Sequence, residues 1–197
     1  MGVDPGRTAR VAAARAWHEV NPMRGPRGGG RGGVKPGLYE RQVRAIMEAA
    51  AERKKAKGNP IVEIMIPLTI ARDEMALARG WVESAIAEAK VKGVDVTIGT
   101  MIEVPRAALL ADEVAEFADF FPFGPNDLTQ MALGFSRDDI EGRIMAPYVE
   151  LGLLAANPFD TLDQDGVGQL VKIAAERGRS TKADLKLGVC GEHGGDP

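Results

Sequence analysis

The sequence has little cysteine, no excess of basic residues and no long apolar run. Cys190 is the only cysteine among 197 residues, so no disulfide can form within the chain, which fits a reducing, cytoplasmic compartment. The chain carries 25 Lys and Arg against 28 Asp and Glu, a net charge of −3, which argues against a nucleic-acid-binding domain held by bulk charge. No apolar segment approaches the roughly 20 residues of a membrane-spanning helix, and the charged, alanine-rich beginning is unlike a signal peptide. These absences indicate a globular chain with one sizeable core, bound neither to nucleic acid nor to a membrane.

Helical and strand patterns alternate along most of the chain. Short apolar runs predict strands over 61–68, 94–102, 120–123 and 185–190, the first of them buried on both faces. Longer patterns predict helices over 7–20, 38–57, 72–92 and 111–118, and a capping box from Thr161 to Gln164 predicts a further helix that runs to about residue 177. Between residues 21 and 33, where glycine and proline are dense, we expect no regular element. Alternating strands and helices predict a parallel sheet with right-handed crossovers.

Polar residues follow the last three predicted strands directly. Glu103 follows one strand, Asn126 and Asp127 follow the next, and His193 follows the last. Because the carboxyl ends of parallel strands face one side of the sheet, these side chains should converge there. A closed (β/α)8 barrel needs roughly 250 residues, so a barrel built from this sequence would lack some of its strands.

Glu103 and Asp127 are candidates to hold a magnesium ion. Two carboxylates brought together repel each other unless a cation lies between them, and Mg²⁺ is held by one or two carboxylates with substrate oxygens and water. Capping of the following helices is an equally good explanation of both residues. The amide of Asn126 could hold a carboxylate or enolate oxygen of a substrate.

Three arginines lie in the glycine-rich segment, at Arg24, Arg27 and Arg31. Arginine recognises phosphate bidentately and glycine lets backbone approach closely, so the segment could bind a phosphoryl group. An RNA-binding tail or a solvated linker would have a similar composition. His193 could orient a substrate or be structural, and Cys190 fits a buried small apolar residue better than a nucleophile.

Six motifs, in order along the chain, resemble the carboxy-terminal domain of the pyruvate, phosphate dikinase family of phosphoenolpyruvate-utilising enzymes. They are HEVNPM at 18–23, GTMIEVPR at 99–106, FGPNDLTQ at 123–130, GFSRDD at 134–139, LDQDGVGQ at 162–169 and GEHGGDP at 191–197. The resemblance implies a (β/α)8 TIM-type barrel, here incomplete with its first and last strands missing. It divides the chain into a helical segment at 1–20 and a partial barrel domain at 21–197.

The resemblance also implies roles for particular residues. The metal, Mg²⁺, would be held by Glu103 and Asp127, and the phosphoryl group by Arg27. The remaining substrate-binding positions implied are Gly124, Pro125, Asn126, Arg137 and His193. The family has Gly-Thr-Asn-Asp where this chain has Gly-Pro-Asn-Asp, so one hydroxyl and one backbone N–H donor are lost. In this chain Arg27 and Arg31 are one residue further apart than the two arginines of the family's glycine-rich motif.

The activity implied is phosphoryl transfer, in which ATP, pyruvate and phosphate give AMP, phosphoenolpyruvate and diphosphate. Phosphohistidine and ATP-grasp domains, absent from this chain, would complete the enzyme, which would form a homodimer. The family's proton-donor cysteine would lie beyond Pro197, and Cys190 does not correspond to it, so we expect a fragment that is inactive in isolation. The alternatives are a magnesium-dependent lyase acting on pyruvate enolate and an inactive barrel fragment that serves in assembly.

Overall fold

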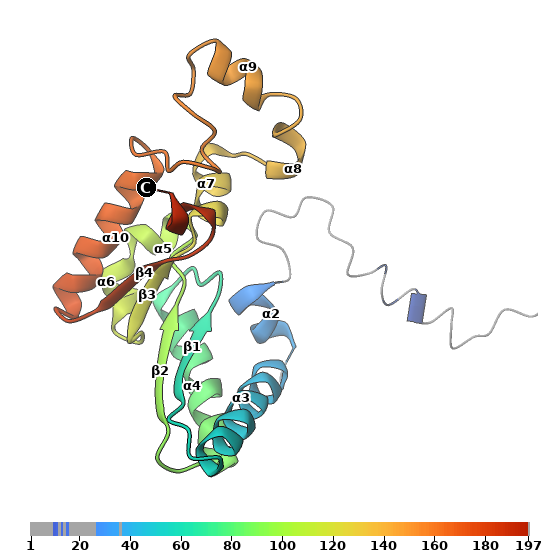
Figure 1. Ribbon diagram of the computed structural model, residues 1–197, viewed down its shortest axis with the longest axis vertical. Helices are drawn as coiled ribbons and strands as arrows, with labels where there is room; N and C mark the ends of the chain where they lie inside the picture. The colour runs from blue at the N-terminus through green and yellow to red at the C-terminus, as the bar shows by residue number, and fades with distance from the viewer. Residues whose placement is uncertain (1–9, 12, 14, 16–26, 36, 197) are drawn as a thin grey trace, which may run out of the picture.

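The computed structural model describes residues 10, 11, 13, 15, 27–35 and 37–196 (Figure 1). Most of the helix predicted over 7–20, and the separate segment proposed for 1–20, fall outside these residues. Within the described part of the chain, no helix is long and apolar enough to cross a membrane.

Four short strands and a series of helices make up the described chain. The strands are β1 (Ile61–Ile66), β2 (Asp95–Thr100), β3 (Phe120–Phe123) and β4 (Lys186–Val189). The longer helices are α3 (Leu38–Lys55), α4 (Arg72–Ala89), α7 (Pro125–Leu133) and α10 (Val167–Thr181). The shorter ones are α2 (Gly28–Val34), α5 (Pro105–Leu109), α6 (Ala111–Ala115), α8 (Arg137–Ile140), α9 (Met145–Glu150) and the 3-10 turn η1 (Glu192–Gly195). The predicted α/β class with parallel strands is confirmed.

The strands form two two-stranded parallel sheets, which follow one another in the order of the sequence. β1 pairs in parallel with β2, and β3 with β4. Beyond the end of β2, Ile102 bridges in parallel to Phe123 and donates its N–H to the carbonyl of Pro122 at 2.9 Å. This bridge joins the two pairs, so the order across the strands is β1-β2-β3-β4.

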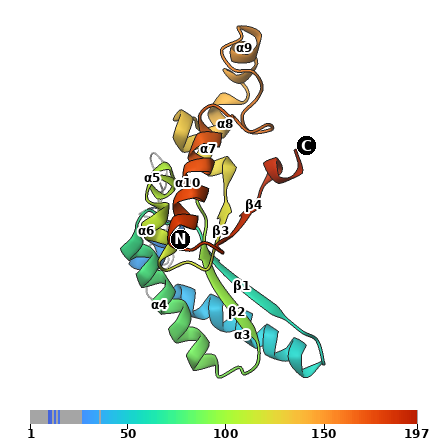
Figure 2. The ribbon, with the colours of Figure 1, turned by 90° about the vertical axis from the view of Figure 1, so that its left-hand side faces the viewer.

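Three helices pack together on one side of the strands. Figure 2 shows α4, α6 and α10 gathered on one side of the strands, while α3 runs beside β1 and β2. The core lies on the helical side, where Phe121, Leu185 and Ile102 pack against small residues of the helices. Strand β1 accordingly alternates, with Val62 and Ile64 buried and Ile61 72% exposed. The prediction that this strand is buried on both faces is therefore wrong.

A helix occupies the glycine-rich segment in which we expected no regular element. Residues 28–34 form α2 despite five glycines, because contacts with distant parts of the chain offset their weak helix propensity. Gly29 donates its N–H to the carbonyl of Pro67 at 2.9 Å. A Cβ on Gly32 would lie within 2.8 Å of the rings of Tyr39 and Trp81, so this glycine lets α2 pack against both aromatic residues.

Several predicted helix boundaries are also wrong: α3 ends at Lys55 rather than at residue 57, α6 at Ala115 rather than at residue 118, and α10 at Thr181 rather than at about residue 177. Helix α4 ends at Ala89, where Lys90 takes a left-handed conformation with φ of 53°, rather than continuing to Lys92. Helix α10 begins at Val167 rather than at Thr161. Asp163 caps its first turn, accepting the Val167 N–H on its side chain at 3.2 Å and the Gly168 N–H on its carbonyl at 2.8 Å. The residues from 161 to 166 therefore form a turn that precedes the helix.

Candidate functional site

The carboxyl ends of the strands bring together most of the residues selected from the sequence. Glu103 follows β2, the segment from Gly124 to Asp127 joins β3 to the first turn of α7, and η1 follows β4. Backbone hydrogen bonds align these strand ends. The N–H of Gly124 donates to the carbonyl of Ile102 at 3.1 Å, and the N–H of Cys190 donates to the carbonyl of Phe123 at 3.1 Å. The candidate site is thus assembled from successive strand ends.

Glu103 is a buried carboxylate held by a backbone donor. The residue is 3% exposed, and its Oε1 accepts the N–H of Leu68 at 2.7 Å. Leu68 lies in the loop after β1 with φ of 55°, a left-handed conformation that is uncommon for a residue with a branched side chain. The loop is fixed on its other side by Gly28, whose missing Cβ would lie 2.6 Å from the Leu68 Cβ. Helix α2 therefore supports the loop that supports Glu103.

Gly124 is required by the close approach of Glu103. A Cβ at position 124 would lie 2.5 Å from Glu103 Oε2 and 2.9 Å from the Glu103 Cβ. Gly124 has no positive φ to satisfy, since its φ is −102°. Its role is to leave space for a carboxylate, and Pro125, buried at the first position of α7, starts the helix directly after it.

Burial raises the pKa of Glu103 to about 7. The hydrogen bond from Leu68 opposes this rise, the negative charge of Asp127 adds to it, and the positive charge of Arg27 lowers it again. Glu103, Asp127 and Arg27 are therefore electrostatic neighbours. A cation beside Glu103 would favour its ionised form in the same way that Arg27 does.

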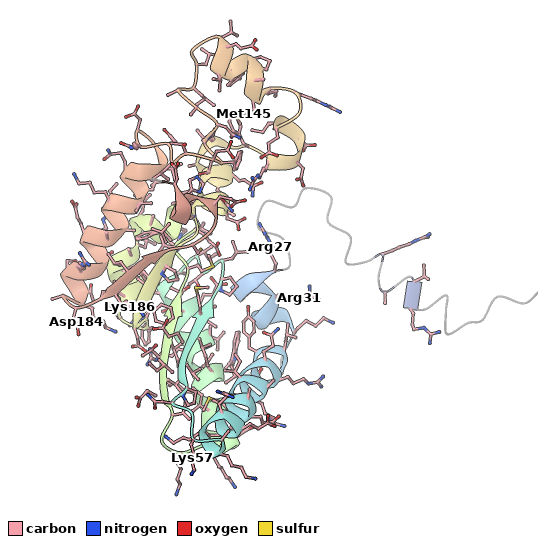
Figure 3. The ribbon with its side chains drawn as sticks, viewed as in Figure 1. Arg27, Arg31, Lys57, Met145, Asp184 and Lys186 are labelled. Carbon is pink, nitrogen blue, oxygen red and sulfur yellow. The ribbon has the colours of Figure 1, made fainter. Side chains whose placement is uncertain are left out.

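Asp127 forms an ion pair with Arg27 across 100 residues of sequence. Arg27 Nη2 lies 2.8 Å from Asp127 Oδ1, and the two side chains are 45% and 23% exposed. Arg27 directly precedes α2, at the level of the strand ends (Figure 3). Arg27 and Arg31 also line a cavity of about 640 Å³ between α2, α3 and β1. Arg27, the residue expected to bind a phosphoryl group, is thus paired with Asp127, a residue expected to bind a metal ion.

Asn126 and Arg137 meet on a residue that the sequence analysis did not select, Glu192. Asn126 Nδ2 donates to Glu192 Oε2 at 2.6 Å, and Arg137 Nη1 donates to Glu192 Oε1 at 3.1 Å. Two donors hold the carboxylate, and the hydrogen bond from Asn126 contributes most to lowering the pKa of Glu192 to about 2. Its position beside His193 in the GEHGGDP motif was the available signal.

His193 and Cys190 make contacts that belong to the packing of the C-terminal segment. His193 is 8% exposed, and its Nε2 lies 2.9 Å from the carbonyl of Pro158. Cys190 Sγ donates to the carbonyl of Phe123 at 3.2 Å, and burial raises the pKa of the thiol. The thiol is therefore held mainly in its protonated form, which is a poor nucleophile.

The oxygen atoms at this site suit a hard divalent cation. The protein would supply only some of the ligands of such a cation. The described residues contain no group of three or more His, Cys, Asp or Glu that could hold a metal ion. Glu103 and Asp127 nevertheless supply carboxylate oxygens, and the charge of Asp127 acts on Glu103. Mg²⁺ binds through one or two carboxylates with the remaining positions filled by substrate and water, so these residues fit it.

Comparison with known proteins relates this arrangement to one family. Residues 2–197 match the model of the PEP-utilising enzyme, PEP-binding domain. The pyruvate, phosphate dikinase of Clostridium symbiosum is 52% identical over 184 residues, which are 91% of this chain and 21% of that protein. The enzyme of Rhizobium meliloti (strain 1021) is 51% identical over 92% of this chain and 21% of its own length.

The chloroplastic pyruvate, phosphate dikinase 1 of Arabidopsis thaliana is 50% identical over 91% of this chain and 19% of its own length. The chain therefore spans about a fifth of the length of the curated relatives it matches. With the family model matching nearly every residue, the chain belongs to the family of PEP-utilising enzymes and corresponds to their PEP-binding domain.

Proposed function

We propose that this chain supplies the magnesium-dependent phosphoenolpyruvate/pyruvate site of a phosphotransferase of the pyruvate, phosphate dikinase type. The reaction is the conversion of ATP, pyruvate and phosphate to AMP, phosphoenolpyruvate and diphosphate. One observation carries the proposal: Glu103, Asp127 and Arg27 form a single charged cluster at the carboxyl ends of parallel strands. A cluster with both signs of charge suits a substrate with a phosphoryl group and a bound cation.

The fold that we propose for residues 21–197 is part of a (β/α)8 barrel. The order β1-β2-β3-β4 follows the sequence, and α4, α6 and α10 lie together on one side (Figure 2). Barrel winding advances in one direction and places all helices outside, whereas doubly wound sheets reverse their order and carry helices on both faces. The exposed face of β1, with Glu63 and Met65, would then be the barrel interior.

The roles that we propose follow the contacts. Glu103 and Asp127 hold Mg²⁺, which supplies charge stabilisation to the enolate and transferring phosphoryl oxygens. Arg27 exchanges the Asp127 carboxylate for the phosphoryl group when substrate binds, since its guanidinium suits either partner. Asn126 orients the substrate carboxylate, and Gly124 and Pro125 form the turn that places Asn126 at the strand end. The substrate thereby meets a cation at its phosphoryl group and a neutral amide donor at its carboxylate.

Arg137 and His193 belong to the edge of this proposed site. Arg137 is tied to Glu141 Oε1 at 2.7 Å and lies over the ring of Phe159, so its guanidinium is already oriented. His193 holds the segment after β4 to Pro158, which fixes the neighbouring Glu192. In the complete enzyme a phosphohistidine domain and an ATP-grasp domain would deliver the phosphoryl group, and two copies would form a homodimer. Catalysis in the cytoplasm is part of the same proposal.

The test is binding of oxalate, a mimic of pyruvate enolate, measured by calorimetry with and without Mg²⁺. The wild-type chain should bind oxalate only with the metal, and Glu103→Gln should abolish this binding because a neutral amide replaces the buried ligand. Glu48→Gln, an exposed position on α3, is the matched control and should bind like wild type. Self-association without metal-dependent binding, or equal binding by Glu103→Gln, would refute the proposal and favour a role in assembly.

A further inference from the structure

Glu192 connects three separate elements at the edge of the candidate site. It lies in η1, after β4, and contacts Asn126 in the first turn of α7 and Arg137 at the start of α8. Each of its two carboxylate oxygens accepts one hydrogen bond, at 2.6 Å from Asn126 Nδ2 and at 3.1 Å from Arg137 Nη1. The Glu192 side chain is 53% exposed, so burial in a core does not explain its conformation.

The contact with Asn126 decides which end of an amide faces the substrate. The oxygen and nitrogen of an asparagine amide are nearly equal in size, and the final torsion of the side chain has a broad, roughly two-fold preference. Rotation of this amide by half a turn would replace an N–H donor by an oxygen acceptor, which repels a carboxylate. An anionic partner on Nδ2 removes this ambiguity, because a carboxylate accepts hydrogen bonds and cannot donate one.

We infer that Glu192 is a positioning residue, which holds the Asn126 amide in the orientation that presents an N–H donor to the substrate carboxylate. The inference rests on the proposed function and deepens it. One proton of Nδ2 is directed to Glu192, and the other remains to bind an anion. Gly191 makes the approach possible, because a Cβ there would lie 3.1 Å from Asn126 Nδ2, and its φ of 76° favours glycine.

Arg137 strengthens this arrangement from the opposite side. Its guanidinium donates to Glu192 and to Glu141, and it lies 5.2 Å from the centre of the Phe159 ring. Glu192 is thereby held between a fixed cation and the amide that it orients. The pKa of Glu192 is lowered to about 2, first by the hydrogen bond from Asn126, so the carboxylate is ionised wherever the chain is folded near neutral pH.

The experiment measures binding of oxalate in the presence of Mg²⁺, and separately binding of Mn²⁺ alone by electron paramagnetic resonance. Glu192→Ala in the 197-residue chain should weaken oxalate binding by roughly 10- to 100-fold, the usual effect of removing a residue that orients a ligand. Binding of Mn²⁺ alone should be unchanged, because its ligands Glu103 and Asp127 are not touched. Glu150→Ala, an exposed carboxylate on α9, is the control.

A double-mutant cycle identifies the route of the effect. In an Asn126→Ala background, Glu192→Ala should change oxalate affinity by less than about twofold, because the amide to be oriented is gone. Glu192→Gln should be intermediate, since glutamine can present either an acceptor or a donor to Asn126. This second variant keeps nearly the same shape, so it also tests the inference if the alanine variant folds poorly.

The outcomes separate the inference from the function on which it rests. Wild-type chain that binds no oxalate with Mg²⁺ would refute both. Wild-type binding that persists in Glu192→Ala would refute the inference alone. A gain in oxalate affinity in Glu192→Ala would show that its carboxylate competes with the substrate, and an equal loss of Mn²⁺ binding would show a merely structural role. Either result would also refute the inference.

Discussion

Replacing Glu103 by glutamine should flatten the dependence of the chain's stability on pH. Glu103 is 3% exposed, and burial raises its pKa from the ordinary 4.5 to about 7. In the unfolded chain the same carboxyl loses its proton near pH 4.5. Between these two pH values the unfolded state gains stability by ionising while the folded state does not, so the free energy of unfolding falls as pH rises.

The size of this effect follows from the two pKa values. One pKa unit corresponds to about 1.4 kcal/mol, so the difference between 4.5 and about 7 corresponds to about 3 kcal/mol. The stabilising contribution of protonated Glu103 is complete below pH 4.5 and is lost by the time the pH exceeds 7. Glutamine at this position keeps an oxygen to accept the Leu68 N–H, which lies 2.7 Å from Glu103 Oε1, but has no proton to lose.

The assay is urea unfolding followed by circular dichroism at pH 5, 6, 7 and 8. Between pH 5 and pH 8 the stability of Glu103→Gln relative to wild type should rise by about 2 to 3 kcal/mol. Glu48→Gln should follow the wild-type curve. At pH 8, Mg²⁺ should stabilise wild type and leave Glu103→Gln unchanged, since a bound cation favours ionised Glu103. Parallel curves for wild type and Glu103→Gln would refute the assignment of a raised pKa to this residue.

Two further predictions use matched pairs of glycines. Gly124→Ala should destabilise the chain by about 1 to 3 kcal/mol and abolish metal-dependent oxalate binding, since its Cβ would meet Glu103 Oε2 at 2.5 Å. Gly142→Ala, whose Cβ would have nothing within 4 Å, should have neither effect. Equal thermal midpoints and equal oxalate affinities of the two variants would contradict this account. Gly32→Ala should lower the thermal midpoint because its Cβ would overlap two aromatic rings, whereas Gly33→Ala, facing open space in the same helix, should raise stability by up to about 1 kcal/mol. The reverse order of the two midpoints would show that α2 does not pack as described.

Local patterns in the sequence predicted the positions of strands and strand ends. The prediction of a strand over 120–123 agrees with β3 at both ends, and α3 begins at Leu38 as predicted. These elements depend on apolar periodicity and on breakers that lie within a few residues. Because polar residues follow the last three strands directly, the convergence of Glu103 and Asp127 could also be predicted.

Contacts between distant segments were not predictable from the same patterns. Helix α2 consists largely of glycine, and its sequence alone favours a loop. The helix is stabilised by a hydrogen bond to Pro67 and by packing against Tyr39 and Trp81. The donor that holds Glu103 is the backbone N–H of Leu68, which no side-chain pattern can reveal. The GEHGGDP motif could have drawn attention to Glu192, but its two donors, Asn126 and Arg137, lie in distant segments that no local pattern identifies.

The geometry of the site depends on neighbouring strands rather than on closure of a barrel. Glu103 is held by the loop after β1, and Gly124 beside it is aligned by the carbonyl of Ile102, next to β3. Asn126 is held in turn from the segment after β4. Each contact joins strand ends that lie next to each other within this chain. The exposed face of the strands, where Glu63 of β1 pairs with Lys186 of β4 at 2.6 Å, contributes to none of these contacts. Binding of metal and oxalate should therefore be measurable on this chain itself, without the remaining strands of a barrel.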